Sequence, residues 1–391
     1  MKQKLSGVGI SEIAVSIPKH YISVAKIAEK SQLSLEYVNN GLGLVQARVP
    51  YNTSLEQLII EALKKINHKD VDRFFIATES DYDMSKAEIG IKTIKNLNIT
   101  AVPFQLKFAC LSGVQALLLA CEYAVAHAKP AIVIAADRSV YEEKKAELTQ
   151  GSGVVAIRIE QNPKLLTLDF KNFGQYSKDI NDFRVPINTA PFPQVDGPLT
   201  KPAFIKCIIK AVNDYKTKNQ DCSSIVKTAD YIVMHTPFTK MIVWSSAALW
   251  YYEKYKSGLE LLKECLTNPE SFTKFKEILD RTRKALDFQT FFERKIKSGL
   301  HYNPYIGNCY TASVFISLIS TLEKAKANQN ICIVGYGGGS GSLVLMGKSK
   351  KSNFQSDLMY QIKNGRELTL EQYQQWRTQT INQIRNCSFR V

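Results

Sequence analysis

The sequence contains no cysteine pair at metal-binding spacing and neither of the common nucleotide-binding motifs. Its 391 residues include eight cysteines, but none forms a C-x-x-C pair, so a zinc site or a redox dithiol is unsupported. The glycine-rich segment 335–342 lacks the helix context of G-x-G-x-x-G and a following Lys-Ser/Thr, which argues against a dinucleotide site or a P-loop. We expect no metal and no redox cofactor.

Long apolar runs and runs of basic residues are also missing. No apolar stretch approaches the ~20 residues that span a bilayer, and the N-terminal segment lacks the apolar region of a secretory signal. We therefore expect a cytoplasmic protein with reduced thiols and no membrane partner. The net charge of +15 comes from lysines spread along the chain. It indicates either a solvated lysine-rich surface or a field that attracts anionic ligands, and gives no specific support to nucleic acid.

Alternating strand-like and helix-like segments indicate the α/β class. Ser54 and Gln57 form a capping-box pattern before a helix that we expect over 55–66. Short apolar runs at 73–77, 131–137 and 153–159 predict buried strands. We interpret 240–300, rich in lysine, glutamate and aromatics, as a helical insertion, and 355–391 as an appended helical or irregular element.

The chain repeats its own pattern. Residues 107–139 and 305–340 each run through a turn, a small-residue helix, a polar break and an apolar strand. The strand before Glu79 is likewise echoed by the strand before His235. We predict two related halves, 1–165 and 166–391, whose strand ends and helix N-termini converge on a ligand-binding crevice.

Four side chains near these ends are candidates for chemistry. Cys110 starts a predicted buried helix, whose positive end lowers the pKa of a thiol. Glu79 ends an apolar strand, where partial desolvation raises the pKa of a carboxyl and suits it to general base catalysis. His235 ends the equivalent strand, and Lys240 follows it within reach of an anionic ligand. Taken singly, each also fits an ordinary structural or surface role.

Taken together, several segments resemble one family. IATES around Glu79, FAC-x-x-G around Cys110, TQGSG at 149–153, VDGPLTK at 195–201, HTPFTKM at 235–241, YIGNCYTAS at 305–313 and the YGGGSG loop resemble 3-hydroxy-3-methylglutaryl-CoA (HMG-CoA) synthases in order and spacing. The resemblance covers essentially the whole chain. It implies the thiolase-like fold, with two pseudo-repeated α/β halves layered as αβαβα, and by fold analogy a homodimer.

The resemblance also implies roles. Cys110 would take the acetyl group from acetyl-CoA, and Glu79 would remove a methyl proton from the acetyl-enzyme. His235 would bind the carbonyl of acetoacetyl-CoA and help protonate the tertiary alkoxide. The product is HMG-CoA, which feeds isoprenoid synthesis through the mevalonate pathway. The family's acyl-CoA contact positions are filled by Thr149, Thr200, Lys240, Asn308 and Gly338.

Departures from the family pattern concern the acyl group. Leu111 follows the cysteine, where the family has an aromatic or small residue. Gly335 and Gly338 replace serines, and DFRVP at 182–186 replaces DFWRP. Two alternatives stay open. One is a synthase acting on carrier-protein-bound β-ketoacyl chains in polyketide branching. The other is a thiolase-fold protein that binds acyl-CoA without turnover, against which the intact catalytic three argue.

Overall fold

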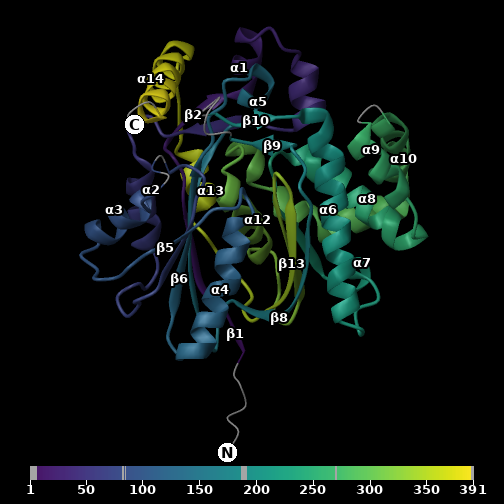
Figure 1. The fold of residues 1–391 in the computed structure, drawn as a ribbon, viewed down its shortest axis with the longest axis horizontal. Helices are drawn as coiled ribbons and strands as arrows, with labels where there is room; N and C mark the ends of the chain where they lie inside the picture. Colours follow the sequence, from purple (N-terminus) through teal and green to yellow (C-terminus); the bar gives the residue numbers. More distant parts are fainter. Residues whose placement is uncertain (1–6, 82, 84, 186–191, 269–270, 389–391) are drawn as a thin grey trace, which may run out of the picture.

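The computed structural model describes residues 7–81, 83, 85–185, 192–268 and 271–388. Its centre is a nine-stranded sheet of order β11-β12-β13-β8-β1-β7-β6-β4-β5 (Figure 1). The strands are β1 (Val8–Ser16), β4 (Phe74–Ala77), β5 (Phe104–Leu106), β6 (Ala131–Arg138), β7 (Ser152–Gln161), β8 (Leu166–Ser177), β11 (Tyr231–Met234), β12 (Asn330–Gly337) and β13 (Gly341–Ser349). The runs at 73–77, 131–137 and 153–159 are strands, as predicted.

The pairing between strands β1 and β8 is much shorter than the pairings on either side of it, β1 with β7 and β8 with β13, and it divides the sheet into two half-sheets. Strand β1 pairs with β7 along its length, but it pairs with β8 only through Gly9–Thr167 and Ile10–Leu166. A Cβ atom on Gly9 would lie 2.1 Å from the Leu166 carbonyl oxygen, so this close crossing requires glycine. Each half-sheet holds a parallel pair at its outer end, β4–β5 in one and β11–β12 in the other.

Helices α4 (Ser112–His127) and α12 (Ser313–Leu322) lie between the half-sheets (Figure 1). Alternation along the strands explains this layering. Phe75 and Val133 face the core shared with α4 and α12, whereas Phe74 and Ile132 face the outer core. Helices α2 (Leu55–Leu63) and α3 (Glu88–Asn96) cover one outer face, and α6 (Gly197–Lys218) and α8 (Thr239–Tyr255) cover the other. The result is the expected αβαβα arrangement.

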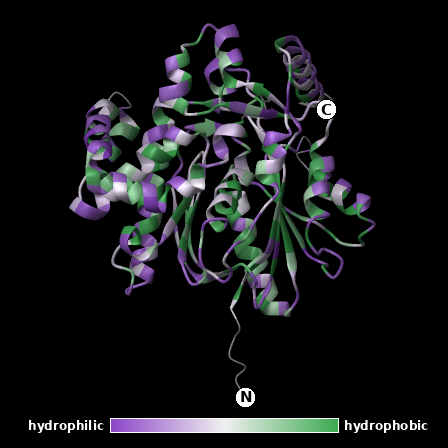
Figure 2. Ribbon diagram, turned by 180° about the vertical axis from the view of Figure 1, so that it is seen from behind, coloured by the Kyte–Doolittle hydropathy of each residue, from purple (hydrophilic) through white to green (hydrophobic). Residues whose placement is uncertain are grey.

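Helix α4 is apolar on most of its faces because it is enclosed by the two half-sheets. Figure 2 shows the hydrophobic colouring concentrated along the central strands and helices. Residues Ala109–His127 form the one helix in the described ranges that is long and apolar enough to cross a membrane, and 67% of that window is buried inside the fold. The expectation that no run approaches this length was therefore wrong for this segment, and burial between sheets accounts for it.

The described residues of the segment 240–300 are mostly helical, as predicted. Helix α8 supplies Met241 and Leu249 to the second core and is one of the fold's layers. The outlying helices are α9 (Leu259–Thr267), α10 (Phe272–Lys284) and α11 (Leu286–Lys295). The tail forms α13 (Leu358–Lys363), β14 (Arg366–Glu367) and α14 (Leu370–Ser388). The capping box of Ser54 and Gln57 is present at the start of α2.

The remaining elements pack around the ends of these layers. They are β2 (His20–Ser23), α1 (Val24–Lys30), η1 (Tyr37–Leu42), β3 (Gln46–Val49), α5 (Lys144–Glu147), β9 (Phe183–Arg184), β10 (Gln194–Val195), α7 (Ile225–Thr228), η3 (Lys297–Leu300), η4 (Asn303–Tyr305) and η5 (Tyr310–Ala312). Figure 1 places α5, β9 and β10 near the same end of the sheet as α1 and β2.

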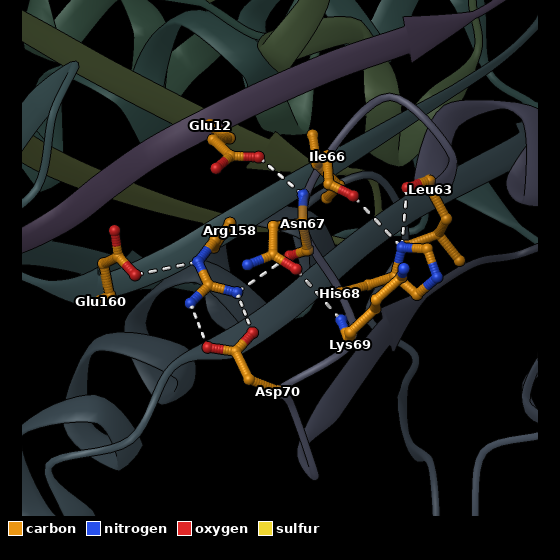
Figure 3. A network of polar contacts seen from close by, with 9 residues as sticks. All are labelled: Glu12, Leu63, Ile66, Asn67, His68, Lys69, Asp70, Arg158 and Glu160. Atoms are coloured by element: carbon orange, nitrogen blue, oxygen red, sulfur yellow. Dashed lines mark hydrogen bonds and ion pairs between the residues drawn. The ribbon is translucent and has the colours of Figure 1, made fainter.

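A polar network fixes the connection that leads into β4 (Figure 3). Arg158 on β7 donates to both carboxylate oxygens of Asp70, at 2.8 and 2.9 Å, and to Glu160 at 2.9 Å. It also donates to the carbonyl oxygen of Asn67. The Arg158 side chain is 6% exposed, and its planar guanidinium suits bidentate binding of a carboxylate. The network therefore holds the start of β4, the strand that ends next to Glu79.

Candidate active site

A cavity of about 830 Å³ lies between the two halves. Six of the residues expected in the site line it: Cys110, Thr149, Thr200, His235, Asn308 and Gly338. Of the lining residues, Cys110 and His235 are buried, whereas Lys145 and Lys276 are exposed to solvent. The two halves thus enclose a passage from solvent to the cysteine.

Cys110 lies two residues before α4 and is 7% exposed. Ala109 before it has a φ of 45°, a conformation that residues with a Cβ atom rarely adopt. The thiol packs among Tyr141, Ala146 and Tyr310. Burial, followed by the charges of Glu79 and Asp137, raises the pKa of Cys110 well above its usual value. The expected lowering by the helix end was wrong, because desolvation and two carboxylates outweigh it.

Glu79 follows β4 and is half-buried, yet its Oε1 atom is buried without a hydrogen-bond partner in the described chain. Burial raises the pKa of Glu79 well above its usual value, the charge of Asp137 adds to this, and Lys107 opposes it. The predicted shift of this carboxyl is therefore confirmed in direction. Glu79 does not line the cavity wall itself, but its charge acts on Cys110.

Asp137, at the end of β6, is a buried carboxylate that connects the two halves. Its Oδ1 atom accepts from the Thr78 hydroxyl, the Glu79 backbone N–H (2.6 Å) and the Ser80 hydroxyl. Its Oδ2 atom accepts from the backbone N–H and hydroxyl of Thr311, at 3.0 and 2.6 Å. Our sequence reasoning missed Asp137. It follows an apolar strand just as Glu79 does, so the same strand-end argument would have found it.

His235 follows β11, the counterpart of β4, and is 2% exposed. Its Nδ1 atom has no hydrogen-bond partner in the described chain, and its ring lies 6.4 Å from that of Phe204, centroid to centroid. Burial lowers the pKa of His235 to about 3, so the imidazole is neutral at physiological pH. A neutral imidazole can still donate one hydrogen bond to a substrate oxygen.

Asn308 lies where the halves touch, ahead of α12. Its Oδ1 atom accepts from the Tyr310 N–H at 3.0 Å and the Ser313 hydroxyl at 3.2 Å, which leaves its amide N–H groups for the cavity. The Asn308 N–H donates to the Thr149 carbonyl oxygen at 2.8 Å. The Thr149 hydroxyl in turn donates to Ala146. These bonds orient the two residues from opposite halves.

Thr200 and Lys240 are placed differently. The Thr200 hydroxyl donates to the carbonyl oxygen of Asp196 at 2.8 Å, within the first turn of α6. Lys240 in α8 packs its stem against Gly43, where a Cβ atom would meet Lys240 Cγ at 3.4 Å. Lys240 is not among the residues that line the cavity.

Close packing surrounds both glycines that replace the family's serines. A Cβ atom on Gly338 would lie 2.4 Å from Phe183 Cβ, and one on Gly335 would lie 2.8 Å from Leu111 Cδ1. A Cβ atom at Gly335 would therefore collide with Leu111, itself a departure from the family pattern, and one at Gly338 would collide with Phe183, which the family pattern shares. Ser340 does not replace the missing hydroxyls, because it donates to Asp182 at 3.0 Å. Gly335 and Leu111 thus form one compensated pair of departures next to the cysteine.

Comparisons with known proteins agree with this geometry. Residues 166–383 match the family model described as hydroxymethylglutaryl-coenzyme A synthase C terminal. A hydroxymethylglutaryl-CoA synthase from Enterococcus faecalis is 26% identical over 96% of this chain and 92% of its own length. The human mitochondrial hydroxymethylglutaryl-CoA synthase is 25% identical over 82% of this chain and 68% of its own length.

Solved structures share the fold. An HMG-CoA synthase complexed with CoA has a TM-score of 0.76 at 23% identity, covering 94% of this chain and 90% of that one. The HMG synthase of the curacin biosynthetic pathway has a TM-score of 0.80 at 21% identity, covering 95% and 88%. The layered fold and its central site define a thiolase-fold, acyl-transferring enzyme. Because the family model matches more than half of the sequence, the chain belongs to the hydroxymethylglutaryl-CoA synthase family.

Proposed function

We propose that the protein condenses acetyl-CoA with acetoacetyl-CoA and releases HMG-CoA and CoA, in the mevalonate pathway. The observation that carries this is the cavity between the halves. It leads from exposed lysines to a buried thiol and a neutral imidazole, which suits a long thioester arm with a reactive end and an anionic end. Further support comes from the relatives, which bear the name of this activity.

In the first half-reaction, the sulfur of Cys110 bonds to the acetyl carbon, and the bond from that carbon to the CoA sulfur breaks. CoA leaves as its thiol, carrying the proton that Cys110 gives up. Because the pKa of Cys110 is raised, the proton must be removed as the sulfur attacks, rather than before. The neighbouring donors stabilise the tetrahedral oxyanion.

In the second half-reaction, the Glu79 carboxylate takes a methyl proton from acetyl-Cys110. The resulting carbon nucleophile bonds to C3 of acetoacetyl-CoA, whose oxygen becomes an alkoxide that His235 holds by a hydrogen bond and helps to protonate. Water then cleaves the cysteine thioester, which frees HMG-CoA and the thiol. The proposal requires no metal and no redox cofactor, since every proton and electron pair stays within these groups.

The test combines purified protein with both thioesters and follows loss of acetoacetyl-CoA and release of free thiol. Intact mass after acetyl-CoA alone should rise by the ~42 Da of one acetyl group, because the nucleophile forms a covalent intermediate. A protein that binds acyl-CoA without turnover gains no mass. Absence of both the mass gain and the condensation would refute the proposal.

A second candidate is a synthase that accepts its β-ketoacyl substrate from a carrier protein. The net charge of +15 suits an acidic partner, and one fold neighbour is the curacin pathway HMG synthase in complex with acetyl donor-ACP. The assay compares acetoacetyl-CoA with an acetoacetyl carrier protein at equal concentrations. Preference for the carrier-linked substrate would replace the first candidate with the second.

We also propose a homodimer that forms through β5. This strand ends the nine-stranded sheet, so one of its edges is unpaired in the described chain. Val102, Phe104 and Leu119 around it are 76%, 44% and 40% exposed, and an exposed apolar edge favours association. Sedimentation should show a dimer, and Phe104→Lys should weaken it. A monomeric wild type would refute this.

A further inference from the structure

The segment between β6 and β7, which contains α5, forms the wall of the cavity beside Cys110. Tyr141 and Ala146 from this segment pack in one cluster with the Cys110 thiol, and both line the cavity. The neighbouring apolar residues Val140 and Leu148 are 5% and 0% exposed and belong to a different core, which they share with α14. One side of the segment therefore contacts the reacting thiol, and the other side contacts the C-terminal helix.

Tyr373 on α14 is fully buried and hydrogen-bonds to this segment at two points. Its hydroxyl donates to the Glu147 carboxylate at 2.7 Å and accepts from the side-chain amide of Gln150. Burial raises the pKa of Tyr373 well above its usual value, and the charge of Glu147 raises it further, so the hydroxyl stays a donor. It thus connects residues on both sides of Thr149, which lines the cavity, to α14.

Arg377, one turn further along α14, holds the same segment through its charge and its planar donor group. Its Nε atom lies 3.0 Å from Oε1 of Glu147, and a terminal nitrogen donates to the carbonyl oxygen of Tyr141 at 2.6 Å. The Arg377 and Glu147 side chains are 17% and 4% exposed, so little solvent screens this ion pair. Two groups of α14 therefore fix Glu147, and one of them also fixes the backbone of Tyr141.

We propose that Tyr373 and Arg377 are positioning residues for the reaction at Cys110, and that they act through Glu147 and the backbone of Tyr141. Neither is among the residues that line the cavity, so their effect on the reaction is indirect. They hold the wall that packs against the thiol, so that its sulfur meets the acetyl carbon in one geometry. The inference rests on the proposed function, because acetylation of Cys110 is the step whose rate they set.

The test follows acetylation of Cys110 by intact mass at increasing acetyl-CoA concentrations, in wild type, Tyr373→Phe and Arg377→Met. At saturation each variant should be acetylated about ten-fold more slowly, because it loses a buried bond to a charged group behind the wall. KM for acetyl-CoA should stay within about two-fold, since no substrate contact is removed. Combining Tyr373→Phe with Glu147→Gln should slow acetylation less than the product of the two single effects, because both changes alter the same bond.

Two matched controls separate positioning from general stability. Tyr123→Phe also removes a buried hydroxyl that donates to a carboxylate at 2.7 Å, that of Asp72, but on the far part of α4. Arg385→Met removes a cation of α14 whose partner, Glu142, lies on the exposed surface of the same wall segment. Both controls should be acetylated at the wild-type rate. Wild-type rates in Tyr373→Phe and Arg377→Met, or equal losses in the controls, would overturn the proposal.

Alkylation of Cys110 by iodoacetamide tests the wall without acetyl-CoA. Because burial raises the pKa of this thiol, a loosened wall that admits water should speed its alkylation about three-fold or more, opposite in sign to the effect on acetylation. Peptide mass mapping should show no change at Cys121, a buried thiol of α4. If the wild type is not acetylated, the proposed function fails, yet a selective rise at Cys110 in the variants still supports the positioning role. An equal rise at Cys121, or no rise at Cys110, overturns it.

Discussion

The ends of β4 and β11 occupy equivalent places in the two halves, yet they hold opposite chemistry. Burial raises the pKa of Glu79 after β4, with help from Asp137. Burial alone lowers the pKa of His235 after β11. Opposite shifts thus favour the neutral form of both groups, because desolvation always disfavours charge. The repeated fold therefore places a carboxyl group and an imidazole around the Cys110 thiol. Because the surroundings are of low polarity, the Glu79 carboxylate is a stronger base than a carboxylate in water.

The strongest test of this comparison removes the thiol between the two ends. Cys110→Ser should abolish covalent acetylation and reduce turnover more than about 10³-fold, because loss of the nucleophile exceeds loss of one oxyanion donor. Intact mass after acetyl-CoA and the condensation assay measure both. Cys121→Ser replaces a buried thiol within helix α4 and is the control. This variant should still be acetylated on Cys110. Near-normal activity of the Cys110 variant would make this thiol structural.

Removing the carboxyl should separate the half-reactions. Glu79→Ala should still acetylate Cys110 but slow condensation ~10²–10⁴-fold, the usual contribution of a positioned base. Acetyl-enzyme should accumulate without exchange of methyl protons for solvent deuterium, as mass spectrometry would detect. Asp83→Ala, which alters an exposed turn carboxylate on the same loop, should behave as wild type. Normal deuterium uptake in the Glu79 variant would transfer the base role to Asp81 or Asp83.

Removing the His235 imidazole should affect the reaction of acetoacetyl-CoA more than the acetylation of Cys110 by acetyl-CoA. His235→Ala should form acetyl-enzyme and weaken acetoacetyl-CoA binding and condensation by about 10²-fold, as expected when one donor to a reacting oxygen is lost. Binding measured on the pre-acetylated variant separates this from acetylation. Unchanged affinity for acetoacetyl-CoA together with lost acetylation would reverse the assignment.

The raised pKa of Glu79 predicts a pH dependence with a definite sign. Deprotonation creates the base, so methyl-proton exchange of preformed acetyl-enzyme should rise about ten-fold per pH unit below that pKa and level off above it. The plateau should begin at a higher pH than for an ordinary carboxyl. Deuterium uptake between about pH 5 and pH 9 provides the measurement. A flat profile across this range would contradict the buried-base assignment.

The smallest effect concerns Asp137, the buried carboxylate that hydrogen-bonds to residues of both halves. Thr311→Val removes the hydroxyl donor to Asp137 and should lower the free energy of unfolding at neutral pH by ~1–3 kcal/mol. Folding raises the pKa of Asp137, so its contribution to stability is present below the unfolded pKa and is lost as pH rises through the folded one. The Thr311 hydroxyl opposes that rise, because its hydrogen bond lowers the pKa of Asp137 and so favours the charged carboxylate. The variant's deficit should therefore shrink in acid, where Asp137 is protonated. Urea unfolding at two pH values tests this, and an equal deficit at both would exclude Asp137 as the cause.

Much of the fold could be predicted from the sequence, because the local patterns of apolar and capping residues were strong. The runs before Glu79 and His235 are short, apolar and bounded by polar residues, and both are strands. The capping box at Ser54 specifies a helix start by itself. The core role of helix α8 could not be predicted, because aromatic and lysine content does not reveal that Met241 and Leu249 belong to the second core.

The candidate active site could be predicted from the sequence only in part. Cys110 and His235 stand out because their residue types and places in the chain are distinctive. The role of Asp137 depends on Thr311, which is 174 residues away, and no local signal connects them. The direction of the Cys110 pKa was mispredicted for a similar reason. The helix end is a local feature, whereas the two opposing carboxylates arrive from other strands.

By itself the sequence determined the α/β class, the repeated strand and helix pattern, and the residue types available for chemistry, because each is set by spacing and side-chain character along the chain. The tertiary structure alone decided which charges face one another, why Gly338 must be glycine opposite Phe183, and that Lys276 reaches the cavity from an outlying helix. Desolvation and close packing depend on the arrangement of distant segments in space, and a linear pattern does not encode those distances.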